Sequence, residues 1–375
     1  MNYFSEISRI IDYGLVGNRD KLSSQVKMLA KQLEKNGERD EAHALKIKLN
    51  KTIKSNNVYT QNALYQKPIP VEKDNRFPLA DYETFSENDV WLALPENIEA
   101  RVEQFLTYIN HRDRLEAEGI PVNPTMLLHG YPGTGKSKLA AYIAAKLSLP
   151  LITARSDALV SSYLGSTSKN IRMLMDYAQE RECVLFLDEF DALAKGRDDS
   201  NEVGELKRVV VSLLQNIDAL DNVILIAATN HPHLLDRAVW RRFQHKIEVP
   251  LPDKGSRKAI VSKWLQEYIS SKVLNLFSDI SEGISGAEIQ NIVFEYKREC
   301  ILKDYKGSEN ENRLLQLLIS YQYPAITFLK KDRKYDIWQV KEKYSDLSAE
   351  KIGMIFGLSK QRIATVLREG KTNAK

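Results

Sequence analysis

The chain has 375 residues, a formal net charge of +4 and 43% hydrophobic residues, which predicts two or three domains with buried cores. Its two cysteines, Cys183 and Cys300, form no C-x-x-C pair and predict neither a disulfide framework nor a zinc site. The amino terminus has no signal-peptide pattern, and no window approaches the roughly 18 uninterrupted apolar residues of a membrane span. We therefore expect a cytoplasmic protein rather than a secreted or membrane-spanning one.

Residues 1–54 contain three segments of helical periodicity, which predict a small N-terminal helical bundle. Residues 55–88 lack periodicity and contain Pro68, Pro70 and Pro78, so we expect a linker there. Residues 1–60 carry 11 basic and 7 acidic side chains, and residues 325–375 carry 12 and 6. The positive charge therefore lies at the two ends of the chain.

A strand, a glycine-rich loop and a helix are predicted in succession from residue 126 onwards. The loop matches G-x-x-x-x-G-K-S, a spacing typical of phosphate binding, because its glycines let successive N–H groups face a polyanion. Lys136 is expected to reach the β- and γ-phosphates, and Ser137 to ligate Mg²⁺. The residues predicted to bind ATP here are Gly130, Tyr131, Pro132, Gly133, Thr134, Gly135, Lys136, Ser137 and Lys138.

Polar side chains follow two further apolar runs. The apolar run 183–187 is followed by Asp188 and Glu189. Asp188 is expected to hold Mg²⁺ through water, and Glu189 is expected to polarise the attacking water in phosphoryl transfer. Residues 223–228 lead to Asn230, whose amide is suited to hydrogen-bond the γ-phosphate or the water. An acidic turn after a core strand is the alternative for the first of these sites.

Residues 234–243 read Leu-Leu-Asp-Arg-Ala-Val-Trp-Arg-Arg-Phe. Here the chain resembles the AAA ATPases, and the resemblance spans residues 90–300. It implies a P-loop three-layer αβα domain over 89–252, a helical lid over 253–324, ATP and Mg²⁺ as cofactors, and hydrolysis of ATP to ADP and phosphate. It also implies that Arg241 and Arg242 are arginine fingers that complete the neighbouring site in a homo-oligomer, a hexamer. Trp240 stands where many relatives carry a further arginine, which leaves open which guanidinium acts. A solvated basic helix end is the alternative.

Three other segments match the family. Residues 161–166 resemble the pore loop of its protein-remodelling branch, in which Tyr163, Leu164 and Gly165 would grip an extended protein client. An ordinary aromatic at a helix end is the alternative. Residues 196–205 occupy the place of a second channel loop. Residues 284–289 match the start of a lid helix, where the small Gly286 and Ala287 would let the adenine approach.

The C-terminal unit, residues 325–375, contains a pattern like that of a helix-turn-helix between residues 347 and 367. Gly357 would make the turn and Ser359 would cap the second helix. The exposed face of that helix would suit a DNA groove through Lys360, Gln361, Arg362 and Thr365. A protein-docking platform is the alternative.

Three functions fit this sequence. The first is an ATP-driven ring that remodels or threads protein clients, and the second is a DNA-associated ATPase of a plasmid or mobile element. The third, a nucleotide-gated scaffold without hydrolysis, is disfavoured by the presence of Lys136, Asp188, Glu189, Asn230 and Arg242. The stretches at 94–96, 111–112, 161–165, 188–191 and 228–232 also look like a bacterial AAA subgroup often found with a subtilisin-like serine protease, some in antiphage defence. This resemblance implies a separate protease as partner, since the chain has no convincing protease site of its own.

Overall fold

The computed structural model describes residues 26, 28–30, 33, 68–72, 76–159, 164–194, 203–220, 223–304, 310–326, 328 and 333–373. The chain divides into two compact units, Met1–Pro68 and Ile69–Lys375. In the first unit the described residues between 26 and 33 are helical, and Leu29, Ala30 and Leu33 are buried. The rest of the predicted N-terminal bundle lies outside the described residues.

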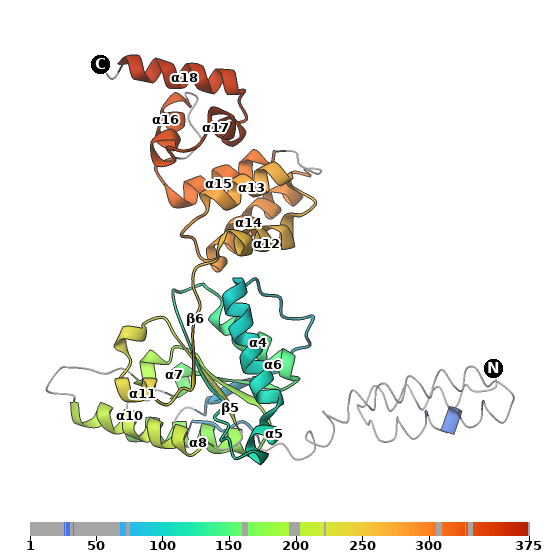
Figure 1. Ribbon diagram of the computed structural model, residues 1–375, viewed down its shortest axis with the longest axis vertical. Coiled ribbons are helices and arrows are strands. Elements are labelled where there is room, and N and C mark those ends of the chain that lie inside the picture. Colours follow the sequence, from blue (N-terminus) through green and yellow to red (C-terminus); the bar gives the residue numbers. More distant parts are fainter. Residues whose placement is uncertain are drawn as a thin grey trace. The chain divides into compact units, whose positions relative to one another are not determined.

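The second unit contains a six-stranded sheet, in the order β1-β3-β4-β5-β2-β6 (Figure 1). The parallel strands are β2 (Thr125–His129), β3 (Leu151–Ala154), β4 (Val184–Leu187), β5 (Ile224–Thr229) and β6 (His245–Glu248). Every residue of β4 and β5 is buried, as expected for central parallel strands that are covered on both faces.

The strand β1 (Ala80–Glu83) corrects the prediction of a linker over residues 55–88. It pairs antiparallel with β3 at the edge of the sheet, and its Ala80 and the preceding Leu79 are fully buried. The strand is short, its Asp81 and Glu83 are exposed, and Pro78 precedes it, which is a tolerated position at a sheet edge. The sequence therefore shows no apolar run there, and the strand depends on pairing with β3.

Helices cover both faces of the sheet, which confirms the predicted α/β class. On one face lie α4 (Glu96–Asn110) and α6 (Lys136–Leu147), and on the other lie α8 (Leu164–Gln179) and α10 (Val203–Asp218). Along β2 the side chains alternate: Met126 and Leu128 join the core under α4 and α6, whereas Leu127 joins the core under α8 and α10. Short helices lie between these elements: α5 (Arg112–Ala117), α7 (Ser156–Leu159), α9 (Asp191–Ala194), η1 (Pro232–Leu234) and α11 (Arg237–Trp240).

The remainder of the second unit is helical. It contains α12 (Lys254–Leu265), α13 (Ser271–Ile280), α14 (Gly286–Leu302), α15 (Asn312–Gln322), α16 (Lys334–Lys343), α17 (Ala349–Phe356) and α18 (Lys360–Asn373). Helix starts are capped by side chains that accept a backbone N–H, as at Asp253, Ser270, Ser285 and Ser348. One hydrophobic core runs from Val261 to Val366, so the helices predicted as the lid and those of the C-terminal unit pack together. Within the described part of the chain, no helix has the length and apolar character needed to cross a bilayer.

Candidate functional site

The phosphate loop connects the end of β2 to the start of α6. Gly133 and Gly135 have φ angles of 75° and 99°, a left-handed conformation that other residues rarely adopt. No side chain caps the first turn of α6, and that turn contains no acidic residue. The backbone N–H groups and the positive end of the helix dipole at this turn are therefore suited to an anion such as phosphate.

Lys136 is folded under this loop and is only 6% exposed. Its Nζ donates hydrogen bonds to the carbonyl oxygens of Gly130, at 2.9 Å, and Tyr131, at 2.8 Å. Burial lowers the pKa of Lys136, and the negative charges of Asp188 and Asp191 act in the opposite direction. The loop thus holds a desolvated ammonium group, which a phosphate oxygen would attract strongly.

Ser137 and Asp188 are brought together by the sheet although they lie 51 positions apart in the chain. The Ser137 hydroxyl donates to Asp188 Oδ2 at 2.6 Å. A hydroxyl and a carboxylate are the hard oxygen ligands that Mg²⁺ accepts, and Mg²⁺ takes its other ligands from water and phosphate. The two residues therefore fit the predicted Mg²⁺ site. The described residues contain no group of three or more His, Cys, Asp or Glu side chains arranged as metal ligands.

Glu189 lies next to Asp188 in an unusual backbone conformation, with φ of 49°. For a residue other than glycine, this backbone conformation costs of order 1–3 kcal/mol of free energy, and it persists only where the surrounding structure holds it. Its N–H donates to Asp188 Oδ1 at 2.9 Å, and its Oε2 accepts a hydrogen bond from Ser156 Oγ at 3.3 Å. Asp188 thus fixes the backbone of Glu189, while Ser156, at the start of α7, contacts its carboxylate.

Asn230 follows β5 and is half-buried. The preceding Thr229 is fully buried, and its hydroxyl donates to Asp191 Oδ1 at 2.6 Å. In addition, the N–H of Phe190 donates to the carbonyl of Ala228 at 2.8 Å. These bonds tie the loop that carries Asp188 and Glu189 to the strand end that carries Asn230, so that the predicted polar groups share one edge of the sheet.

The start of α14 lies against the phosphate loop. The N–H of Ala287 donates to the carbonyl of Gly133 at 3.0 Å, and a Cβ on Gly133 would come within 2.7 Å of Ser285 Oγ. Lys138 Nζ also donates to Gln290 Oε1 at 3.0 Å. The predicted base-contacting pair, Gly286 and Ala287, is therefore next to the loop.

Sequence reasoning missed several residues around the site, namely Leu92, Ser156, Asp191, Thr229 and Ile260. Leu92 Cδ1 would lie 3.2 Å from a Cβ on Gly135, and Ile260 Cδ1 would lie 3.6 Å from one on Gly286. These two apolar side chains therefore lie beside the phosphate loop and the start of α14. No local motif marks them, because they reach the site only through tertiary packing.

The two predicted arginine fingers have different surroundings. Arg241 is the C-cap residue that follows α11 and is exposed, whereas Arg242 is half-buried and pairs with Asp218, the last residue of α10. Trp240, just before them, packs edge-on against His129 with ring centroids 5.3 Å apart. Burial lowers the pKa of His129, which directly precedes the phosphate loop. The arginine segment therefore contacts the end of β2 in its own chain.

The predicted pore loops fall largely outside the described residues. This is the case for Tyr163 and for residues 195–202. Leu164 and Gly165 are the first residues of α8, and Val203 begins α10.

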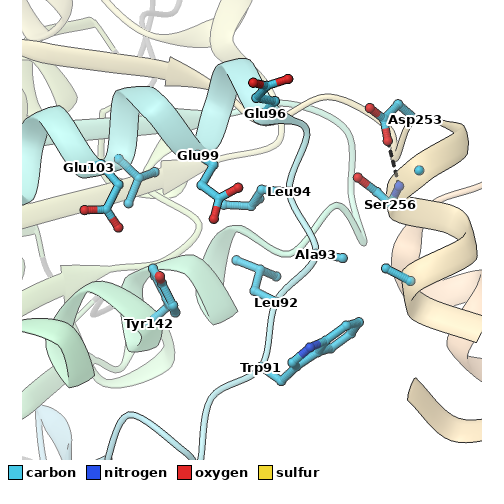
Figure 2. A pocket seen from close by; sticks show the side chains of 13 residues that line it. Trp91, Leu92, Ala93, Leu94, Glu96, Glu99, Glu103, Tyr142, Asp253 and Ser256 are labelled. Carbon is cyan, nitrogen blue, oxygen red and sulfur yellow. Dashed lines mark hydrogen bonds between the residues drawn. The ribbon is translucent and has the colours of Figure 1, made fainter. Parts of the chain in front are cut away.

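A pocket of about 410 Å³ lies between residues 91–94, α4 and the start of α12 (Figure 2). Its lining includes Glu96, Glu99, Glu103 and Asp253 but no lysine or arginine. Such a negative lining repels phosphate, and no residue of the phosphate loop contributes to it. The acidic lining therefore makes this pocket unsuited to the phosphates, which the loop between β2 and α6 fits better.

Comparison with known proteins agrees with this geometry. Residues 126–251 match the family described as ATPase family associated with various cellular activities (AAA). The chain is similar to an uncharacterized AAA family ATPase of Sinorhizobium fredii, with 40% identity over 213 residues that cover 54% of this chain and 63% of the relative. It is also similar to a proteasome-activating nucleotidase of Methanoculleus marisnigri, with 37% identity over 48% of this chain and 46% of the relative.

The chain thus spans less than two thirds of either of these relatives. A longer match is to a proteasome-activating nucleotidase of Pyrococcus furiosus, with 30% identity over 279 residues that cover 68% of this chain and 70% of the relative. Motif, fold and relatives agree, and the chain belongs to the AAA family of ATPases.

Proposed function

We propose that this protein hydrolyses ATP in a ring of identical subunits, a hexamer, and uses the energy to remodel or thread protein clients. The observation that supports the hydrolysis of ATP most directly is the 2.6 Å contact between Ser137 and Asp188 with Glu189 beside it. A binding-only site needs the phosphate loop, but it does not need a carboxylate held next to the metal ligand.

Each residue has a distinct part in the proposed reaction. When bound, Mg²⁺ offsets negative charge on the β- and γ-phosphates and would be held by Ser137 and Asp188. Lys136 and the α6 N–H groups hold the phosphates in line. Glu189 accepts a hydrogen bond from the attacking water, and the Asn230 amide orients that water or the γ-phosphate. Arg241 and Arg242 of a neighbouring subunit offset the charge that develops in the transition state.

Protein clients are proposed from two observations. Two of the relatives reported above carry the name proteasome-activating nucleotidase, and the segment Tyr163, Leu164 and Gly165 has the residue types of a gripping pore loop. We propose that the ring acts in the cytoplasm and delivers clients to, or controls, a separate subtilisin-like protease in bacterial defence.

The test of this function combines mass, ATPase rate and client processing. We expect specific activity to rise with protein concentration as ATP drives assembly to about six subunits, because each site needs a neighbour's arginine. Tyr163→Ala should keep basal hydrolysis and lose the unfolding of a tagged client. Full hydrolysis by a monomer would contradict the shared site, and undiminished unfolding by Tyr163→Ala would contradict the pore loop.

A second candidate function, a DNA-associated ATPase, is favoured by the geometry of α17 and α18. Gly357 adopts φ of 65° at the turn, and Ser359 Oγ accepts the N–H of Arg362 at 3.3 Å. A Cβ on Gly353 would come within 2.5 Å of the Leu358 carbonyl oxygen, so only glycine allows this close turn. These features support the predicted helix-turn-helix, whose second helix enters the major groove in DNA-binding proteins.

A further inference from the structure

The C-terminal helices are packed onto the lid instead of hanging from it by a flexible tether. Ile352, Ile355 and Phe356 of α17 are fully buried in the same core as Leu314 and Leu318 of α15. The buried Gln316 donates from Nε2 to the carbonyl of Ile355 at 3.0 Å. Because close-packed cores transmit displacement, a movement of the lid carries α17 with it.

Polar contacts reinforce this packing at a second point. Asp279 of α13 pairs with Lys254 at 2.5 Å and with Lys351 at 3.0 Å. Partial burial acts to raise the pKa of Asp279, but hydrogen bonds from the two lysines lower it below its usual value. Lys254 begins α12, directly after the exit from β6, and Lys351 lies on α17. One carboxylate therefore contacts both the first helix of the lid and the helix-turn-helix.

The other end of the lid contacts the nucleotide loop. Ala287 and Gln290 of α14 bond to Gly133 and Lys138, respectively. Any change in the position of the phosphate loop then alters the contacts of α14. The helix α14 in turn packs on α12 and α15 within the shared core.

The exposed side chains of α18 are polar or charged, and most of the charged ones are positive. They are Lys360, Gln361, Arg362, Thr365, Arg368 and Glu369. No acidic residue occurs between Lys351 and Arg368, and Glu369 is paired with Lys334 at 3.0 Å. This face suits a polyanion that also presents hydrogen-bond donors and acceptors in a groove, such as duplex DNA.

We propose that α18 binds duplex DNA and that its affinity for DNA depends on the nucleotide bound at the phosphate loop, through the core that the lid shares with α17 and α18. The proposal rests on the second candidate function. It adds regulation: ATP and DNA are coupled ligands of one chain. By linkage, DNA must then change the affinity for nucleotide by the same factor.

The experiment measures fluorescence anisotropy of a labelled mixed-sequence duplex of about 15 base pairs at low salt, where phosphate contacts dominate. The protein is the full chain with Glu189→Gln, which keeps ATP bound, and it is titrated with ATP, with ADP and without nucleotide. Sedimentation of the same samples identifies concentrations at which the assembly state is constant. Lys136→Ala serves as the control that should not respond to nucleotide. Arg298→Ala is the matched control for Arg362→Ala, since Arg298 is an exposed arginine of α14.

We expect DNA affinity to differ at least about fivefold between nucleotide states, the lower end of typical coupling. The difference should vanish in Lys136→Ala. Arg362→Ala should weaken DNA binding about tenfold while Arg298→Ala does not. Equal affinity in all nucleotide states, or an undiminished difference in Lys136→Ala, would overturn the coupling and leave the DNA-associated function standing. No binding in any state would remove that function and the proposal together.

Discussion

Arg242 and Asp218 of the same chain form an ion pair in which Nε lies 2.6 Å from Oδ1. The guanidinium Nε makes no aligned hydrogen bond, so the pair is a charge contact. The two side chains are 37% and 49% exposed, and a pair this exposed contributes at most about 1 kcal/mol. The neighbouring Arg241 is exposed. The structure thus distinguishes two arginines that their sequence context leaves equivalent.

We predict that Arg241 makes the main contact with the neighbouring site and that Arg242 positions the segment. Arg241→Ala should lower kcat by about a thousandfold, the lower end of the range for an arginine finger. Arg242→Ala and Asp218→Ala should have similar, smaller effects, because each removes the same contact. Steady-state ATPase rates of the assembled variants provide the measurement.

Mixing experiments separate a contribution from the neighbour from a contribution within one chain. Arg241→Ala combined with Lys136→Ala should recover part of the activity, because some interfaces then contain one intact loop and one intact arginine. A larger loss in Arg242→Ala than in Arg241→Ala, or no recovery in any mixture, would show that this assignment is wrong.

The second prediction concerns Glu189. Glu189→Gln should keep ATP affinity within about threefold and lower kcat at least a hundredfold, because an amide cannot accept the proton of the attacking water. Glu182→Gln is the matched control, since Glu182 is an exposed glutamate just before β4. Equilibrium nucleotide binding and single-turnover hydrolysis provide the two readouts. A Glu189→Gln chain that hydrolyses ATP at the parent rate would remove this carboxylate from the mechanism.

Local patterns were sufficient for the central parts of this site. The phosphate loop, Asp188, Glu189 and Asn230 each follow an apolar strand directly, and parallel strands bring such strand ends to one edge. The sequence therefore predicted which groups would meet there. The contact of Ser137 with Asp188 at 2.6 Å follows from that rule.

Other features depend on contacts that no local pattern encodes. Ser156 reaches Glu189, and Thr229 reaches Asp191, only because β3, β4 and β5 are neighbours. The edge strand β1 was assigned to a linker because a strand of four residues at the edge of a sheet has too few apolar positions to show a period. The joint core of the lid and the C-terminal unit was missed since each set of helices is amphipathic by itself.

The third prediction concerns Gly353 of α17, which packs against the turn between α17 and α18. Gly353→Ala should lower the free energy of unfolding by about 1–3 kcal/mol, because its Cβ would press against the Leu358 carbonyl oxygen and force the backbone apart. Gly357→Asn is the control, since asparagine tolerates the left-handed conformation at φ of 65° and should cost less than about 1 kcal/mol. Urea unfolding followed by circular dichroism measures both. Equal stability of Gly353→Ala and the parent would contradict the close turn.

The last prediction uses the two cysteines as reporters of two different cores. Cys183 lies in the core between the sheet and α8, whereas Cys300 lies in the core of the lid, and each is only 1% exposed. Burial raises the pKa of Cys183 to about 12 and also raises that of Cys300. Since the thiolate is the reactive species, both should resist iodoacetamide at pH 8 until their own core opens.

Labelling in increasing urea, with each site mapped by mass spectrometry, should therefore give one unfolding curve for each core. ATP should shift the Cys300 curve as well as the Cys183 curve to higher urea, because the lid contacts the phosphate loop through Ala287 and Gln290 and a ligand that binds only the folded state stabilises it. A Cys300→Ser chain confirms the assignment of the Cys183 signal. Rapid labelling of Cys183 in the native protein would contradict its burial, and a Cys300 curve that ATP leaves unchanged would show that lid and loop are not coupled.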